Sequence, residues 1–435
     1  MKLTIFQSGP GDCLLLTSSD DRRMLIDGGF VGTFREHVRK HLSDVAGENG
    51  IDLLCVSHID EDHIAGTLQL LQDLIDWRVY DHHKDQPDSN LTDAPRFPRP
   101  PEIAKIWHNG FKDVSQQNNL ADIEELLILN MRAFGTTSET HALAEQMQFL
   151  ATSVRQGLKL QHQISEKLLN IPLNPEYGGG LMFVPDPQET FSVGNMKTTL
   201  VGPFKEDLDA LRDEWNDWID DNKSKITKLK EWAKDQQRRF RLDEGEIFKR
   251  VLREFALSGQ KRGKVTVPNL ASLMMYVEDA DKKVLLTGDG RDDEILDGLW
   301  ASELWDEGQP LHLDILKIQH HGSINNVNAN FCKNVIADHY VICGGSGGTH
   351  KNPDTEVLDM IVNSRTGAAS QKSTHAKVND HFTLWFSSNN ESGGKSANKH
   401  MKAVMKHIHS KEAASNGRFD ARFMPKNRHF MEIEL

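Results

Sequence analysis

The chain has 435 residues, of which 38% are hydrophobic and 26% are charged, and its formal net charge is −13. These values are typical of a soluble globular protein and exclude a fibrous, largely disordered or membrane-embedded chain. The first residues lack the apolar core of a signal peptide and no apolar stretch is long enough to span a bilayer, so a cytoplasmic protein without membrane contact is expected.

Short apolar runs separated by turns predict a sheet at the start of the chain, with strands near 3–6, 13–16 and 24–26. A helical pattern follows at 33–42. The apolar run 51–57 predicts a strand buried on both faces, and apolar residues then recur at helical intervals from Ile64 to Trp77. A strand, an acidic loop and a helix therefore follow one another around residue 60.

Two polar, mostly helical segments are expected near 111–171 and 207–255, with a β segment near 180–203 between them. The strand pattern then returns near 271–277, 284–289, 313–318 and 340–343, and residues 387–399 have the composition of a loop. Two sets of strands with flanking helices predict a four-layer α/β fold. The expected units are 1–110 for the first half of the sandwich, 111–264 for a mostly helical insertion, and 265–435 for the second half with a basic C-terminal region.

The four cysteines are scattered, and two of them lie in apolar runs, where cysteine acts as a small hydrophobic side chain. Neither disulfides nor a zinc-thiolate site is expected. Although the net charge is negative, residues 351–435 contain more Lys and Arg than Asp and Glu. This bias fits either an anionic partner or a solvated face.

His58, Asp60, Asp62 and His63 stand together directly after the strand 51–57. A divalent ion needs several deprotonated donors at about 2 Å, and a cluster on one turn supplies them. We expect His58 and Asp60 to bind one ion and Asp62 and His63 to face a second. The alternative is a solvated loop that caps the next helix, but capping needs one carboxylate and no histidine.

Further polar residues follow other predicted strands. Asp27 lies in Asp27-Gly28-Gly29, Asp289 ends Thr287-Gly288-Asp289, and the pair His320 and His321 precedes Gly322-Ser323. An ordinary turn at the end of a strand is the alternative for each of them.

With these motifs the sequence resembles the metallo-β-lactamase superfamily, and most closely the hydrolase domain of ComEC-type DNA-uptake proteins and their soluble relatives. The resemblance covers approximately residues 1–110 and 265–350 and implies an αββα sandwich with helical insertions. It implies that Asp289 bridges two metal ions, that His320 or His321 is a further ligand, and that Asp27 orients the cluster. The superfamily usually has His where Asp60 stands, whereas the ComEC-like branch often has Asp. An oxygen donor there makes manganese as suitable as zinc.

The resemblance leaves the roles of two histidines open. The middle histidine ligand of the superfamily has no obvious counterpart; His108 is one candidate, with a structural histidine as the alternative, so operation with a single ion stays open. His350 resembles the Gly-His-Pro turn of ComEC-like domains and is a candidate contact to a phosphate or leaving group, with a loop histidine of no role as the alternative.

Metal ions in such an arrangement lower the pKa of bound water toward neutrality, and Asp62 or Asp289 is expected to orient the hydroxide as a catalytic residue. A serine nucleophile at Ser346, within Gly344-Gly345-Ser346-Gly347-Gly348, is disfavoured because no helix starts at that serine.

The resemblance implies a phosphodiester substrate, hence a nuclease acting on DNA or RNA. The C-terminal lysines fit this function if they follow a phosphate backbone, and an exposed helix is the alternative; they are Lys395, Lys399, Lys402, Lys406 and Lys411. Hydrolysis of a small ester, lactone or cyclic nucleotide also stays open, since one fold hosts many chemistries. So does a non-catalytic module whose helical insertions bind a partner protein or form a homodimer.

Overall fold

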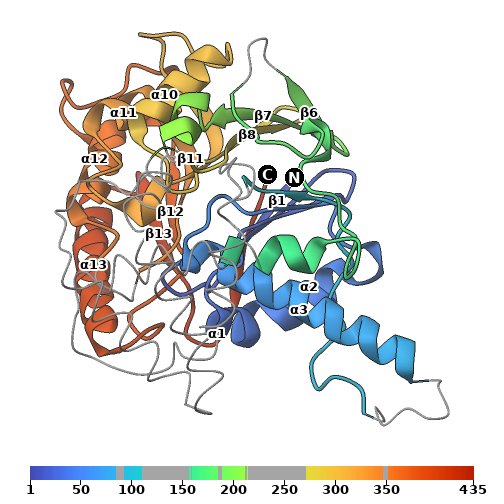
Figure 1. The fold of residues 1–435 in the computed structure, drawn as a ribbon. Coiled ribbons are helices and arrows are strands. Elements are labelled where there is room, and N and C mark those ends of the chain that lie inside the picture. The colour runs from blue at the N-terminus through green and yellow to red at the C-terminus, as the bar shows by residue number, and fades with distance from the viewer. Residues whose placement is uncertain are drawn as a thin grey trace, which may run out of the picture.

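The structure is a computed structural model that describes residues 1–84, 93–109, 156–157, 159–184, 189–210, 213, 271–345 and 351–435. Most of the two expected helical insertions lies outside the described residues, as do Ser346 and His350. The described part is a mixed α/β fold with two sheets and several helices (Figure 1).

The first sheet has six strands in the order β14-β1-β2-β3-β4-β5. Antiparallel pairing joins the first three strands in sequence, and parallel pairing joins β3, β4 and β5. The last strand of the chain pairs antiparallel with the first, so Lys2 lies opposite Glu434 and the two termini lie close together (Figure 1). The strands are β1 (Lys2–Phe6), β2 (Leu14–Thr17), β3 (Arg23–Ile26), β4 (Leu53–Cys55), β5 (Ile106–Trp107) and β14 (Phe430–Glu434).

The second sheet has eight strands in the order β13-β12-β11-β10-β9-β8-β7-β6. The β segment expected near 180–203 is an antiparallel hairpin, β6–β7, at one edge of this sheet. From β9 to β13 the strands are parallel. The strands are β6 (Thr190–Val193), β7 (Met196–Gly202), β8 (Met274–Asp279), β9 (Lys282–Leu286), β10 (Leu311–Lys317), β11 (Val335–Ile342), β12 (Phe382–Phe386) and β13 (Phe419–Phe423).

Helices lie on the outer side of each sheet (Figure 1). Beside the first sheet are α1 (Val31–Thr33), a π-helical turn (Phe34–Val38), α2 (Arg39–Ala46) and α3 (Glu61–His83). Beside the second are α10 (Asp292–Ala301), α11 (Ala329–Asn334), α12 (Thr355–Thr366) and α13 (Lys395–Ala414). Within the described ranges, no helix is both long and apolar enough to cross a bilayer.

Strand residues alternate between two apolar cores. Leu14 and Leu16 of β2 pack in a core shared with the second sheet, whereas Leu15 packs in the core under α2 and α3. In the same way Leu53 faces the other sheet and Leu54 faces the helices. This alternation follows from the twofold periodicity of a strand, and it confirms the prediction that the run 51–57 is buried on both faces. A third core lies between the second sheet and α10 to α13.

Candidate metal centre

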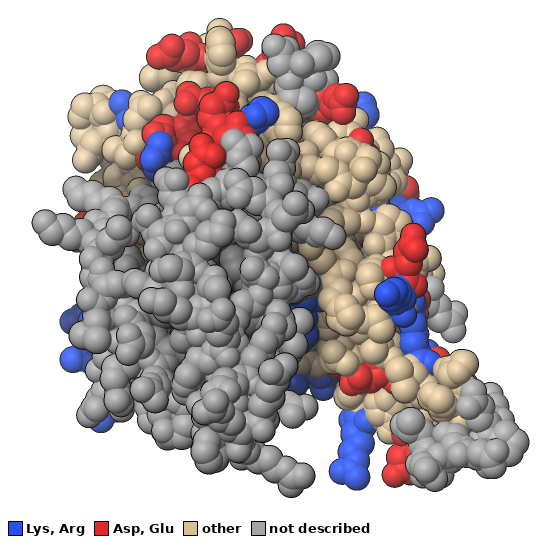
Figure 2. Space-filling view, in the orientation of Figure 1, with Lys and Arg blue, Asp and Glu red and all other residues tan. Residues whose placement is uncertain are grey.

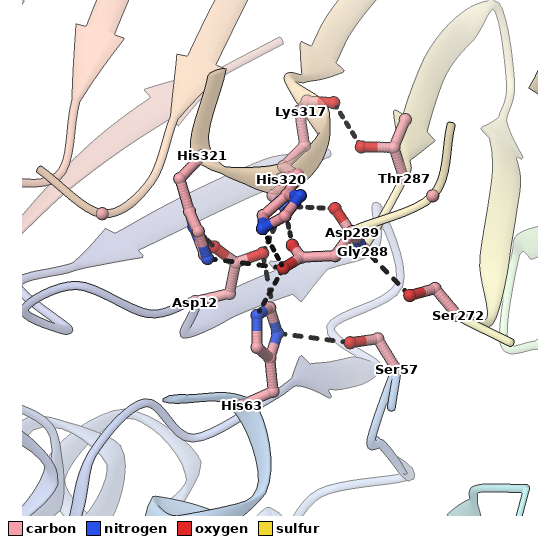
Figure 3. Close-up of polar contacts among 12 residues, drawn as sticks. Asp12, Ser57, His63, Ser272, Thr287, Gly288, Asp289, Lys317, His320 and His321 are labelled. Carbon is pink, nitrogen blue, oxygen red and sulfur yellow. Dashed lines mark hydrogen bonds and ion pairs between the residues drawn. The ribbon is translucent and has the colours of Figure 1, made fainter. Parts of the chain in front are cut away.

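The predicted site residues lie where strands end. Asp27, His58 and His108 follow β3, β4 and β5, which are parallel neighbours, so the carboxyl ends of these strands meet at one edge of the first sheet. Asp289 and His320 follow β9 and β10 of the second sheet in the same way. The two edges face each other, and the site lies between them (Figure 3).

One carboxylate oxygen is the centre of the cluster. Oδ2 of Asp289 lies 3.5 Å from Nε2 of both His63 and His321. Nε2 of His320 and Nε2 of His58 lie 3.7 Å and 3.8 Å from the same oxygen. The structure therefore brings together both members of the histidine pair that the sequence left as alternatives, although His320 is the more exposed one.

The backbone turns the pair inward. His320 and His321 both have positive φ, 45° and 55°, in the left-handed region that side chains with a Cβ rarely adopt. Two such residues in succession are strained, and strain of this kind is concentrated at functional sites. Here it lets adjacent side chains both reach Asp289 (Figure 3).

Two further carboxylates contact different histidines of the cluster. Oδ2 of Asp60 lies 3.5 Å from Nε2 of His58. The carboxylate of Asp62 lies 3.2 Å from Nε2 of His321 and 4.0 Å from Nε2 of His63. Asp289 therefore contacts a histidine that lies next to Asp60 and histidines that lie next to Asp62.

Four imidazoles present Nε2 to Asp289, and each of them, like His108, has a neighbour at Nδ1. Asp27 accepts a hydrogen bond from Nδ1 of His63 at 2.8 Å and also accepts one from the Ser57 hydroxyl. Such contacts fix the orientation and the tautomer of a metal-binding histidine. The other Nδ1 contacts are His58 with Ser57 Oγ at 3.0 Å, His108 with Val56 O at 3.3 Å, His320 with Asn326 Oδ1 at 2.7 Å and His321 with Asp12 Oδ1 at 3.2 Å.

Several buried atoms of the cluster have no hydrogen-bond partner. They are Nε2 of His58, His63, His108 and His321, Nδ1 of His321, and Oδ1 of Asp12, Asp60 and Asp289. Leaving a buried polar atom unpaired costs about 1–3 kcal/mol, so a group of them facing one another indicates a site for cations. Nitrogen and carboxylate donors of this kind fit zinc or manganese.

Four buried residues of the cluster offer ligand atoms that all lie within 4.8 Å of one another; they are Asp12, His63, Asp289 and His321. Burial opposes ionisation of Asp289, but His321, His63 and His320 outweigh it and hold its pKa well below the usual value. Burial likewise opposes protonation of His321, but Asp289 and Asp12 outweigh it and raise the pKa to about 10.

His108 differs from the other histidines, because burial lowers its pKa to about 4. Its imidazole is fully buried and neutral, and the free Nε2 is the atom that a metal ion would take. His108 lies near His58, since its Nδ1 contacts the carbonyl of Val56, two residues before His58, and the charge of His58 contributes to lowering the pKa of His108.

The sequence analysis missed Asp12 and Lys317. Asp12 lies in the turn between β1 and β2, where a Cβ on Gly11 would come within 1.8 Å of the Asp62 carbonyl oxygen. Lys317 ends β10 and is 1% exposed. Burial opposes the charged form of both, yet their mutual attraction raises the pKa of Lys317 and lowers that of Asp12, with help from Asp289 and His321. Lys317 is a charged residue inside the apolar run 315–318, and this is the feature of the sequence from which its buried position could have been predicted.

The turn that contains Asp27 packs closely against α3 because glycines stand on both sides of the contact. A Cβ on Gly66 would lie 1.9 Å from the Gly28 carbonyl oxygen, and a Cβ on Gly28 would lie 2.2 Å from the Thr67 nitrogen. The Gly28 N–H donates to the His63 carbonyl at 2.8 Å. This close approach brings Asp27 within hydrogen-bond distance of His63.

No protein-family model matches the sequence, and no curated protein matches it. Among solved structures, the chain is similar to Zn²⁺-bound PqqB from Methylobacterium extorquens, with a TM-score of 0.37 and 8% sequence identity over 100% of both chains.

Proposed function

We propose that the chain is a metal-dependent hydrolase with a metallo-β-lactamase fold, a four-layer αββα sandwich, and that it cleaves phosphodiesters in DNA or RNA. The observation that carries the proposal is the convergence of four imidazole Nε2 atoms on one oxygen of Asp289, at the ends of strands from both sheets. A carboxylate shared in this way is suited to bridge two divalent ions, zinc or manganese.

In this proposal each half of the cluster holds one ion. His58, Asp60 and His108 serve the first ion, Asp62, His63 and His321 serve the second, and Asp289 is shared. Ions held there would lower the pKa of a bound water toward neutrality and would place positive charge beside the phosphate oxygens.

The open side of the cluster indicates where water and substrate enter. The side chains of Asp62 and His320 are 24% and 25% exposed, whereas those of His58 and Asp289 are 1% and 3% exposed. We therefore assign Asp62 to orient the attacking water, and His320 to contact the substrate or an ion.

A row of lysines on α13 supports a polyanionic substrate. The lysine row consists of Lys395, Lys399, Lys402 and Lys406, all exposed. The buried residues of α13 are Ala397, Met401, Val404 and Ile408, so helical periodicity puts the row on the face opposite to the core. Within α13 no Asp or Glu precedes Glu412. In Figure 2 basic side chains are visible at the left edge, beside α13, while acidic ones gather at the top over α10.

The N-terminal half of α13 lies close to the cluster. A Cβ on Gly345 would lie 2.8 Å from Sδ of Met401, and one on Gly344 would lie 3.0 Å from Cβ of His321. His400 contacts the Pro353 carbonyl at 3.2 Å. The buried face of α13 therefore packs against the loops that flank the histidine pair, and the lysine row lies on the solvent face of the same helix.

The test is cleavage of linear DNA, circular DNA and RNA by the purified protein with Mn²⁺, Zn²⁺ or Mg²⁺. Asp289→Ala is expected to abolish cleavage, while Asp297→Ala, which removes an exposed carboxylate from α10, keeps it. Metal-dependent hydrolysis of a small ester or lactone without any cleavage of nucleic acid would overturn the substrate assignment. Absence of bound metal after reconstitution would overturn the hydrolase assignment and favour a binding module.

A further inference from the structure

Lys317 is a buried cation whose hydrogen-bonding and ionic contacts all lie at the metal centre. Its Nζ donates to the Gly288 carbonyl at 2.6 Å, lies 3.7 Å from Oδ1 of Asp289 and forms an ion pair with Asp12 (Figure 3). Gly288 directly precedes Asp289. The lysine is therefore held against the backbone and the side chain of the bridging carboxylate.

Asp12 contacts both Lys317 and the histidine pair. One of its oxygens contacts Lys317, and the other lies 3.2 Å from Nδ1 of His321. Its backbone N–H donates to the Asp62 carbonyl at 3.2 Å. Because Asp12 lies in the turn between β1 and β2 of the first sheet and Lys317 ends β10 of the second, the pair also joins the two sheets at the site.

The charges of the cluster explain why a cation is needed there. Five carboxylates surround the site, those of Asp12, Asp27, Asp60, Asp62 and Asp289. In the part of the chain that the structure describes, Lys317 is the one Lys or Arg that forms an ion pair with any of them. Two divalent ions carry four positive charges, and Lys317 carries the fifth. A buried charge left without compensation is strongly destabilising.

We propose that Lys317 is a positioning residue of the metal centre: it holds Asp12 so that Asp12 fixes Nδ1 of His321, and it balances the fifth carboxylate. The inference rests on the proposed metal binding. Loss of contacts of this kind around a metal ligand lowers metal affinity about 10–100-fold.

The experiment compares Lys317→Met, Asp12→Asn and the double variant with the wild type. Lys282→Met is the matched control, since Lys282 also lies next to a carboxylate, Asp314, but on β9 away from the site. Zinc and manganese contents are measured after dialysis, affinities by competition with a chelator, and thermal unfolding with and without metal.

Lys317→Met is expected to lower the affinity for the more weakly held ion about 10–100-fold, because Asp12 loses the ion pair that holds it beside His321, and this loss outweighs the electrostatic gain from removing a positive charge near the ions. Lys282→Met is expected to leave the affinity unchanged. Asp12→Asn is expected to weaken binding because it leaves Lys317 unpaired beside the ions. The double variant should bind better than Asp12→Asn, because it no longer places an unpaired cation beside the ions and the introduced asparagine keeps a side-chain oxygen next to Nδ1 of His321. This non-additivity separates positioning from a general loss of folding.

Wild-type affinity in Lys317→Met would overturn the inference while leaving the proposed function intact. If Lys317→Met does not fold, the comparison of Asp12→Asn with the double variant decides, and equal affinities in these two would also overturn it. Absence of metal binding by the wild type would instead overturn the proposed function itself.

Discussion

Replacing the lysine row by glutamine tests whether α13 follows a phosphate backbone. Lys395 and Lys406 are eleven residues apart, which at about 1.5 Å per residue spans about 16 Å along the helix. Each phosphate neutralised by a lysine contributes about 0.7 to the slope of log K against log salt for a single strand and about 0.9 for a duplex. If all four lysines contact phosphates, the quadruple variant K395Q/K399Q/K402Q/K406Q should lower the slope by about 3 to 4.

The affinity loss follows from that slope. Since the wild type and the variant should converge near 1 M salt, a slope change of about 3 corresponds to at most about a thousandfold loss at 0.1 M. Lysine and glutamine have similar helix propensities, so α13 is expected to stay folded. The assay is fluorescence anisotropy of labelled oligonucleotides with metal-free protein, which prevents cleavage, at salt concentrations from about 0.05 to about 0.3 M.

The control variant replaces four exposed lysines elsewhere with glutamine and so changes the net charge equally; they are Lys40, Lys197, Lys205 and Lys426. The lysine row is refuted as a binding surface if its variant keeps the wild-type slope, or if the control variant lowers the slope as much. In either case the reasoning from helix periodicity to a phosphate track is wrong.

Three other predictions concern the site and its support. Asp27→Asn removes the charge that accepts from Nδ1 of His63, so chelator competition should show about 10–100-fold weaker metal binding; unchanged affinity would contradict the orienting role. Gly66→Ala places a Cβ 1.9 Å from the Gly28 carbonyl oxygen, whereas a Cβ on Gly32 meets nothing within 4 Å. Urea unfolding should therefore show a loss of about 3 kcal/mol for G66A and a much smaller change for G32A, and equal changes would refute the close-contact argument. Burial, and then Asp207, raise the pKa of Glu294 from 4.5 to about 7. Because the folded state binds this proton more tightly than the unfolded chain, the carboxylate has no effect on stability below about pH 4.5 and costs up to about 3 kcal/mol above pH 7. Glu294→Gln should thus raise the melting temperature at pH 8 and make little difference at pH 4; a gain independent of pH would refute this cause.

Much of the candidate site could be predicted because its residues follow strands directly. His58, Asp60, Asp62 and His63 are neighbours in the sequence, and a dense group of His and Asp after an apolar run is a strong local pattern. Asp289 and the histidine pair follow apolar runs as well. Parallel strands bring such positions to one edge of a sheet, so their convergence follows from the order of elements. The ligand roles of these residues, the number of ions and the substrate stay predictions.

Other parts of the site had no comparable pattern. Asp12 is one acidic residue among 64 Asp and Glu, in a turn that suggests nothing more than the end of a strand. The role of Asp12 in the site depends on its ion pair with Lys317, which lies far away in the sequence and in the other sheet. The pairing of β14 with β1 likewise joins the two ends of the chain, and no local periodicity reports a contact at that separation.

The sequence by itself determined the candidate metal-binding motif after the run 51–57 and which runs form buried strands, because side-chain chemistry and twofold alternation are local properties. The tertiary structure decided how these residues and strands come together at one site. It placed Asp289 opposite four imidazoles, turned His320 and His321 inward through left-handed backbone, and closed the site with Asp12 and Lys317 from different sheets. These arrangements depend on how two sheets pack face to face, and that packing is set by the whole apolar core rather than by any one segment.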